Sequence, residues 1–206
     1  MAETPKNPPA DLKPIPTWLA FSFVFWPLAF VGLIVHELAH GLTAQALGGE
    51  VLALWVFPGI ELWPDFGVPY DGTFTYFGLV RYLGEPGWTD TERGWATLMG
   101  SGSTFVVGVV ALIALLSIRP RNRWLRYLLI SLALWYLDML TYTVFPQLGL
   151  PHWIIVGGRT PEPVIGAERL GVDRTLFTVV VVLVCAGMSA ALWRHLRRLS
   201  SANNDI

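Results

Sequence analysis

The sequence HELAH at residues 36–40 lies near the end of a long apolar segment. No Asp, Glu, Lys or Arg occurs from residue 14 to residue 35, and after Glu37 none occurs before Glu50. Positions i and i+4 share one face of a helix, so His36 and His40 can reach one metal ion, and Glu37 can approach a water molecule on that metal. Polar side chains beside lipid are costly without a partner, which argues against an accidental match. The motif therefore predicts a metal site on a helix in apolar surroundings.

Composition extends this apolar setting to most of the chain. Of the 206 residues, 53% are hydrophobic and 14% are charged, which is too apolar for an ordinary soluble domain. A helix needs roughly 20 apolar residues to cross a bilayer, and four stretches approach or exceed that length. These stretches cover residues of about 17–47, 95–118, 124–145 and 175–198. The sequence predicts an all-α integral membrane bundle of about four transmembrane helices, a multi-pass protein of a prokaryotic cell membrane.

The expected organisation is a single membrane-embedded domain over residues 17–198. Residues 1–16 contain five prolines and charges of both signs, which favours a disordered leader, and residues 199–206 form a polar tail. Residues 50–93 contain β-prone runs at 51–57 and 73–77, which predict a small β-hairpin or loop insertion between the first two helices. This insertion is either a structural lid or an edge strand that captures an extended substrate by β-pairing.

Charge and cysteine content exclude other kinds of site. A net charge of −1 gives no indication of nucleic-acid binding, which leaves the lipid bilayer and a membrane-protein substrate as the expected partners. The single cysteine, Cys185, excludes a disulfide within the chain and a cysteine-based zinc site. Gly100, Thr104 and Gly108 share a face of the second helix, where small residues allow close packing, and we interpret them as packing residues only.

The histidine pair needs a third ligand, because a catalytic zinc ion usually has three protein ligands and one position left for water. Asp138 is the leading candidate, since it is the only acidic residue within the last three apolar stretches. The first and third helices run parallel, and at 1.5 Å per residue Asp138 and His36 differ in depth by only about 6 Å. The alternatives are His152, just after the third helix, and Glu61, in a loop rich in Pro and Gly. His195 belongs to the basic C-terminal segment and is expected to be solvated.

These motifs carry a resemblance to a known family. The segment HELAH in an apolar helix, followed by Gly48-Gly49-Glu50-Val51 at the start of a β-prone run, resembles the site-2 protease family of intramembrane zinc metalloproteases. The resemblance covers roughly residues 30–145. In that family the third ligand is an aspartate on the second helix after the motif helix, often preceded by leucine, and Leu137-Asp138 occupies that place. The chain lacks the Asn-Pro pair that often precedes this aspartate and the glycine that often follows it.

The sequence thus predicts an intramembrane zinc metalloendopeptidase that holds one Zn²⁺ per chain through His36, His40 and Asp138. Glu37 would act as the catalytic base toward zinc-activated water, and the substrate would be a transmembrane or juxtamembrane segment of a membrane protein. One alternative is a metal-ion transporter or channel, because intramembrane His and Glu residues also line metal pathways. Another is a catalytically inactive membrane scaffold with a metal site.

The 14 Lys and Arg residues are unevenly divided between the two ends of the expected bundle. Nine lie on the side of the termini and five on the opposite side, so the positive-inside rule places both termini in the cytoplasm. The histidine motif would then lie toward the outer face. The family resemblance implies a site nearer the cytoplasmic face, and both orientations stay open at this point.

Overall fold

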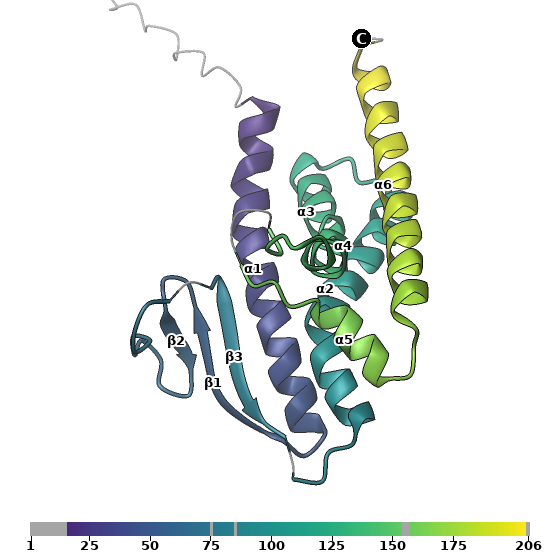
Figure 1. The fold of residues 1–206 in the computed structure, drawn as a ribbon. Helices are drawn as coiled ribbons and strands as arrows, with labels where there is room; N and C mark the ends of the chain where they lie inside the picture. The colour runs from purple at the N-terminus through teal and green to yellow at the C-terminus, as the bar shows by residue number, and fades with distance from the viewer. Residues whose placement is uncertain (1–15, 75, 85, 154–156, 205–206) are drawn as a thin grey trace, which may run out of the picture.

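The computed structural model describes residues 16–204 except 75, 85 and 154–156, so the leader expected at residues 1–16 lies almost entirely outside the described residues. Long helices form a bundle, and a three-stranded sheet lies beside the first of them (Figure 1). The start of the first helix and the end of the last lie at the same end of the bundle, and the sheet lies toward the other (Figure 1).

Within the described residues, four helical segments are long and apolar enough to cross a membrane, as the hydropathy of the sequence predicts. Trp18, Phe23 and Trp26 of the first helix are 67–70% exposed, as expected of a surface that faces lipid. The segments are α1 (Thr17–Ala46), α2 (Asp90–Ile118), the consecutive helices α3 (Arg123–Ala133) and α4 (Tyr136–Val144), and α6 (Arg174–Asn204).

The third of these segments is interrupted between α3 and α4. The Trp135 N–H donates to Leu132 O at 3.0 Å, and the Asp138 N–H donates to Trp135 O at 3.1 Å, which are three-residue rather than four-residue spacings. Gly108 of α2 lies against this break, where an added Cβ would come within 2.8 Å of Tyr136 N. The small-residue face of α2 therefore packs closely, as predicted, against the turn that carries Asp138.

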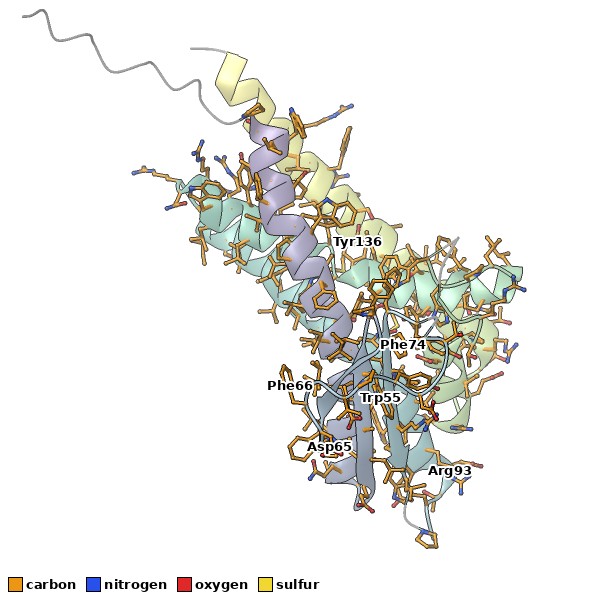
Figure 2. All side chains as sticks on the ribbon, turned by 90° about the vertical axis from the view of Figure 1, so that its left-hand side faces the viewer. Trp55, Asp65, Phe66, Phe74, Arg93 and Tyr136 are labelled. Carbon is orange, nitrogen blue, oxygen red and sulfur yellow. The ribbon has the colours of Figure 1, made fainter. Side chains whose placement is uncertain are left out.

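The insertion after α1 is a three-stranded antiparallel sheet in the order β2-β1-β3, formed by β1 (Glu50–Val56), β2 (Ile60–Trp63) and β3 (Gly78–Leu83). The prediction of a strand at 73–77 is wrong, because the strand that pairs with β1 begins only at Gly78. The Phe74 ring instead packs against the Tyr70 and Tyr76 rings, at centroid distances of 5.3 and 6.0 Å. In the loop between β2 and β3 Phe66 is 79% exposed, whereas Trp55 of β1 is buried (Figure 2).

The sheet covers the C-terminal half of α1. A Cβ at Gly41 would lie 3.2 Å from Val51 Cγ2 and 3.3 Å from Val80 Cγ2, so the helix and the sheet are in close contact at that point. A helix of 30 residues is about 45 Å long, more than the hydrocarbon thickness of a bilayer. Protein thus shelters the part of α1 that carries the histidine motif.

The polar segment expected between the third and fourth helices contains the short helix η1 (Pro146–Leu148) and a helix that the sequence did not predict, α5 (Glu162–Arg169). This helix crosses α2 closely, because a Cβ at Gly94 would lie 2.9 Å from Gly166 O, and a Cβ at Gly166 would lie 2.9 Å from Gly94 O. The crossing brings the first turn of α5 toward the histidine motif. At the other end of the chain, α6 continues to Asn204 and includes most of the expected polar tail.

Candidate metal centre

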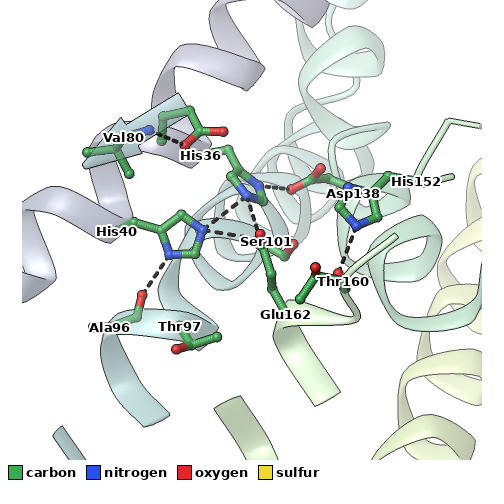
Figure 3. Close-up of polar contacts among 12 residues, drawn as sticks. His36, His40, Val80, Ala96, Thr97, Ser101, Asp138, His152, Thr160 and Glu162 are labelled. Carbon is green, nitrogen blue, oxygen red and sulfur yellow. Dashed lines mark hydrogen bonds and ion pairs between the residues drawn. The ribbon is translucent and has the colours of Figure 1, made fainter. Parts of the chain in front are cut away.

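The two histidines of the motif lie on one face of α1 and are buried, with 2% and 6% of His36 and His40 exposed. Their Nε2 atoms are 3.2 Å apart (Figure 3). This is the arrangement that the i, i+4 spacing predicts. The two Nε2 atoms are therefore close enough to bind the same metal ion.

Glu162, at the start of α5, completes a group of three. Its Oε2 atom lies 3.5 Å from His36 Nε2 and 3.4 Å from His40 Nε2. Ligand atoms held about 2.0–2.1 Å from a tetrahedral zinc ion are about 3.3 Å apart, so all three separations suit one ion with a fourth position free. Among the described residues, these three form the group of His, Cys, Asp and Glu side chains that could hold a metal ion.

The charge of Glu162 suits a ligand. Burial raises the pKa of its carboxyl group, but contact with His36 and His40 outweighs burial and lowers that pKa well below its ordinary value. The Oε2 atom is buried and has no hydrogen-bond donor among the described residues. A cation between the three residues would supply a partner for this oxygen.

Gly100 of α2 leaves the space that such an ion requires. A Cβ at this position would lie 2.1 Å from His40 Nε2 and 2.7 Å from His36 Nε2. Any larger residue would therefore put a methyl group against both ligand nitrogens. The interpretation of Gly100 as a packing residue was incomplete, since the glycine also keeps the ligand side of the imidazoles open.

The far side of each imidazole is held by a hydrogen bond. His40 Nδ1–H donates to Ala96 O at 2.6 Å, and His36 Nδ1 bonds to Asp138 Oδ2 at 2.7 Å. A carbonyl oxygen can only accept, so His40 carries its proton on Nδ1 and leaves the Nε2 lone pair free when the ring is neutral. Metal-binding histidines commonly make this kind of second contact, which fixes the ring and its tautomer.

Asp138 lies beside His36, as the depth argument predicts, but not where a third ligand would lie. Its Oδ2 accepts from His36 Nδ1 and from Thr104 Oγ1, each at 2.7 Å, whereas the Nε2 atom of His36 faces Glu162. The group of described residues that could hold a metal ion does not include Asp138. The reason is that Asp138 approaches His36 from α4 on the Nδ1 side of the ring, where the Thr104 hydroxyl of α2 also donates to its carboxylate.

Glu37, the predicted base, lies between α1 and the sheet. Its Oε2 accepts from the Val80 N–H at 3.1 Å, and its Cγ lies 2.6 Å from the point where a Cβ of Gly78 would be. Glu37, His40 and Glu162 line a cleft of about 270 Å³ with residues of β3. The base and two of the three candidate ligands therefore open onto the same space.

The other candidates from the sequence lie outside the group of three. His152 lines the cleft and is buried, its ring stacks on Tyr142 at a centroid distance of 3.7 Å, and its Nε2–H donates to Thr160 O at 2.7 Å. Burial lowers the pKa of His152. Glu61 is buried on β2 and accepts from Asp65 N at 3.1 Å. His195 is half-buried on α6, near the arginines of the basic end.

Comparison with protein-family models, with curated proteins and with solved structures found no match to this chain. The candidate centre therefore stands on its own geometry.

Proposed function

We propose that this protein is an intramembrane zinc metalloendopeptidase of the kind that the sequence resembles. The observation that carries the proposal is the convergence of His36 Nε2, His40 Nε2 and Glu162 Oε2, with separations of 3.2–3.5 Å, next to a glutamate on the same helix turn. Two histidines and a glutamate with one open position are the ligand set of a large class of hydrolytic zinc sites.

In this proposal Glu162, rather than Asp138, is the third ligand. A bound zinc ion would polarise the scissile carbonyl and lower the pKa of a water molecule toward about 7. Asp138 is a positioning residue: its hydrogen bond from His36 Nδ1 orients the ring and raises the basicity of Nε2. Thr104 in turn orients the carboxylate of Asp138.

Glu37 would accept a proton from water in the cleft and deliver it to the leaving amine. Its position supports this role, because it follows His36 directly and opens onto the cleft that His40 and Glu162 also line. Residues of β3 and His152 also line this cleft.

The substrate class follows from the surroundings of the centre. The motif helix and the segment of α3 and α4 that carries Asp138 are long and apolar enough to cross a membrane, which favours transmembrane or juxtamembrane segments of other proteins as substrates. A helical substrate hides its carbonyl groups in hydrogen bonds, so it must unwind locally before cleavage. Residues that weaken a helix are therefore expected near the cleaved bond.

A metal-ion transporter and an inactive scaffold are the competing proposals. The interruption between α3 and α4 beside Asp138 is a feature that ion-transporting proteins also use, which gives the transporter its one supporting observation. Zinc flux into proteoliposomes that depends on His40 would favour transport.

The test of the proposed function pairs metal analysis with cleavage. Purified protein should contain about one zinc ion per chain. The Glu37→Gln variant should keep that zinc and lose cleavage of a single-span model substrate with a Gly-Ser segment inside its span. Normal cleavage by Glu37→Gln would refute the proposed mechanism with Glu37 as the base, whereas zinc bound without any cleavage by the unmodified protein would favour the scaffold.

A further inference from the structure

The backbone of β3 offers unpaired hydrogen-bonding groups to the cleft. This strand is at the edge of the sheet, with β1 on its inner side. Phe77 O accepts from Phe57 N, and Leu79 and Arg81 are the partners of Trp55 and Ala53, so the odd-numbered residues exchange hydrogen bonds with β1. The even-numbered residues then turn their N–H and C=O groups outward.

Glu37 already occupies the central position on this outer side. Its carboxylate accepts from the Val80 N–H at 3.1 Å and lies against Gly78, where a side chain would collide with it. Val80 and Gly78 both line the cleft that contains His40 and Glu162. The side chain proposed as the base therefore takes the place that the carbonyl oxygen of an added strand would take.

We propose that Glu37 and an extended polypeptide segment compete for the Val80 N–H, so that strand addition to β3 releases Glu37 toward the metal centre. This inference rests on the proposed function for the role of the released carboxylate. An edge strand binds extended peptides through just such outward backbone groups. Without a peptide, the Glu37 carboxylate stays hydrogen-bonded to the Val80 N–H. When a peptide pairs with β3, this hydrogen bond breaks and the carboxylate can turn toward the bound peptide.

The coupling has a structural basis in the contact between α1 and the sheet. Val80 contributes its N–H to Glu37 and its side chain to the contact with Gly41, one helix turn further along α1. The donor and the base are thus fixed relative to each other by packed elements, and only the Glu37 side chain needs to rotate. The device would suppress cleavage of folded chains, which present no free strand.

The experiment measures peptide binding in zinc-free protein, so it does not depend on catalysis. The probe is a fluorescein-labelled octapeptide of alternating Val and Thr, which favours an extended conformation, and its affinity is read by fluorescence anisotropy in detergent. Glu37→Ala removes the competing carboxylate and should tighten binding by about tenfold, the lower end of the effect of one hydrogen bond to a charged group.

A second variant identifies the donor. Replacement of Val80 by its α-hydroxy acid changes the N–H to an ester oxygen and leaves the side chain in place. This protein should bind the probe more weakly, and Glu37→Ala should no longer tighten binding in its background. The same ester at Leu79 removes a hydrogen bond to β1 instead and should leave the tenfold effect of Glu37→Ala intact.

Equal probe affinity in Glu37→Ala and the unmodified protein would overturn the proposal, and so would a gain that persists without the Val80 N–H. Both results are independent of zinc binding and cleavage, which are measured separately. Failure of the competition would therefore leave the proposed protease standing, and failure of cleavage would leave the competition standing.

Discussion

Gly100→Ala is the substitution that the geometry of the centre most clearly predicts to prevent zinc binding. The added methyl carbon would lie 2.1 Å from His40 Nε2, about 1.3 Å short of the 3.4 Å at which ordinary van der Waals contact begins. It would also lie 2.7 Å from His36 Nε2. The backbone of α2 is packed against α1 and α5, so the imidazoles must move.

A displacement of that size is incompatible with zinc binding, which tolerates errors of about 0.2 Å in ligand distances. Loss of a single outer hydrogen bond already weakens metal binding by about 10- to 100-fold, and displacement of two ligands should exceed the upper figure. We expect Gly100→Ala to purify with far less than one zinc ion per chain, measured by mass spectrometry of the metal and by competition with a chelator.

Two further variants separate loss of the site from misfolding. Gly102→Ala is the matched control on the same helix, since its Cβ would meet only Met99 Sδ at 3.5 Å, and it should keep its zinc. Adding His40→Ala to Gly100→Ala removes the closest collision, leaves the one with His36 Nε2 at 2.7 Å, and should recover part of the thermal stability in the zinc-free state without recovering zinc. Zinc bound by Gly100→Ala with unchanged affinity would refute the proposed position of the ion.

Three other outcomes are expected. Asp138→Asn should weaken zinc binding by about 10- to 100-fold, because it changes only the hydrogen bond behind His36. Glu162→Gln should weaken zinc binding more, because it removes a charged ligand. If chelator competition gave the reverse order of affinities, Asp138 would be favoured as the ligand. Zinc at 100 times its dissociation constant should stabilise the folded protein by about 2.7 kcal/mol, so a melting temperature that does not fall when zinc is chelated would count against zinc binding to the folded protein. The arginine distribution predicts that alkaline phosphatase fused after Gly87 is active outside the cytoplasm, whereas an active cytoplasmic reporter at the same place would support the orientation of the resembling family.

The histidine pair and its neighbour Asp138 were predictable because each depends on a regular helix. The spacing of His36 and His40 fixes their shared face, and counting residues along two parallel helices brings Asp138 to the same depth. The four long helices follow from hydropathy for the same reason. What residue counting does not give is the direction from which a side chain approaches, and Asp138 reaches the far nitrogen of His36.

Glu162 was missed because its position depends on tertiary packing. It lies in a polar segment between two prolines, Pro161 and Pro163, which reads as a loop, and α5 has only eight residues. Its place at the centre is set by the crossing of α2 and α5 at Gly94 and Gly166. One local signal was present, since proline and an acidic residue are both favoured in the first turn of a helix.

The strand β3 was misplaced by a few residues for a related reason. The alternation of Thr73, Phe74 and Tyr76 is typical of a strand, but the Phe74 ring packs on the Tyr70 and Tyr76 rings in the loop. Register is set instead by pairing with β1 and by contact with α1 at Gly41, neither of which is visible in a local pattern.

The most direct test of the central claim is anomalous diffraction at the zinc absorption edge from crystals of the zinc-loaded protein. We predict one strong peak per chain, about 2.0–2.2 Å from His36 Nε2, His40 Nε2 and a carboxylate oxygen of Glu162, with Asp138 still bonded to His36 Nδ1. A peak ligated by Asp138 in place of Glu162, or crystals from saturating zinc with no peak between the two histidines, would contradict the account.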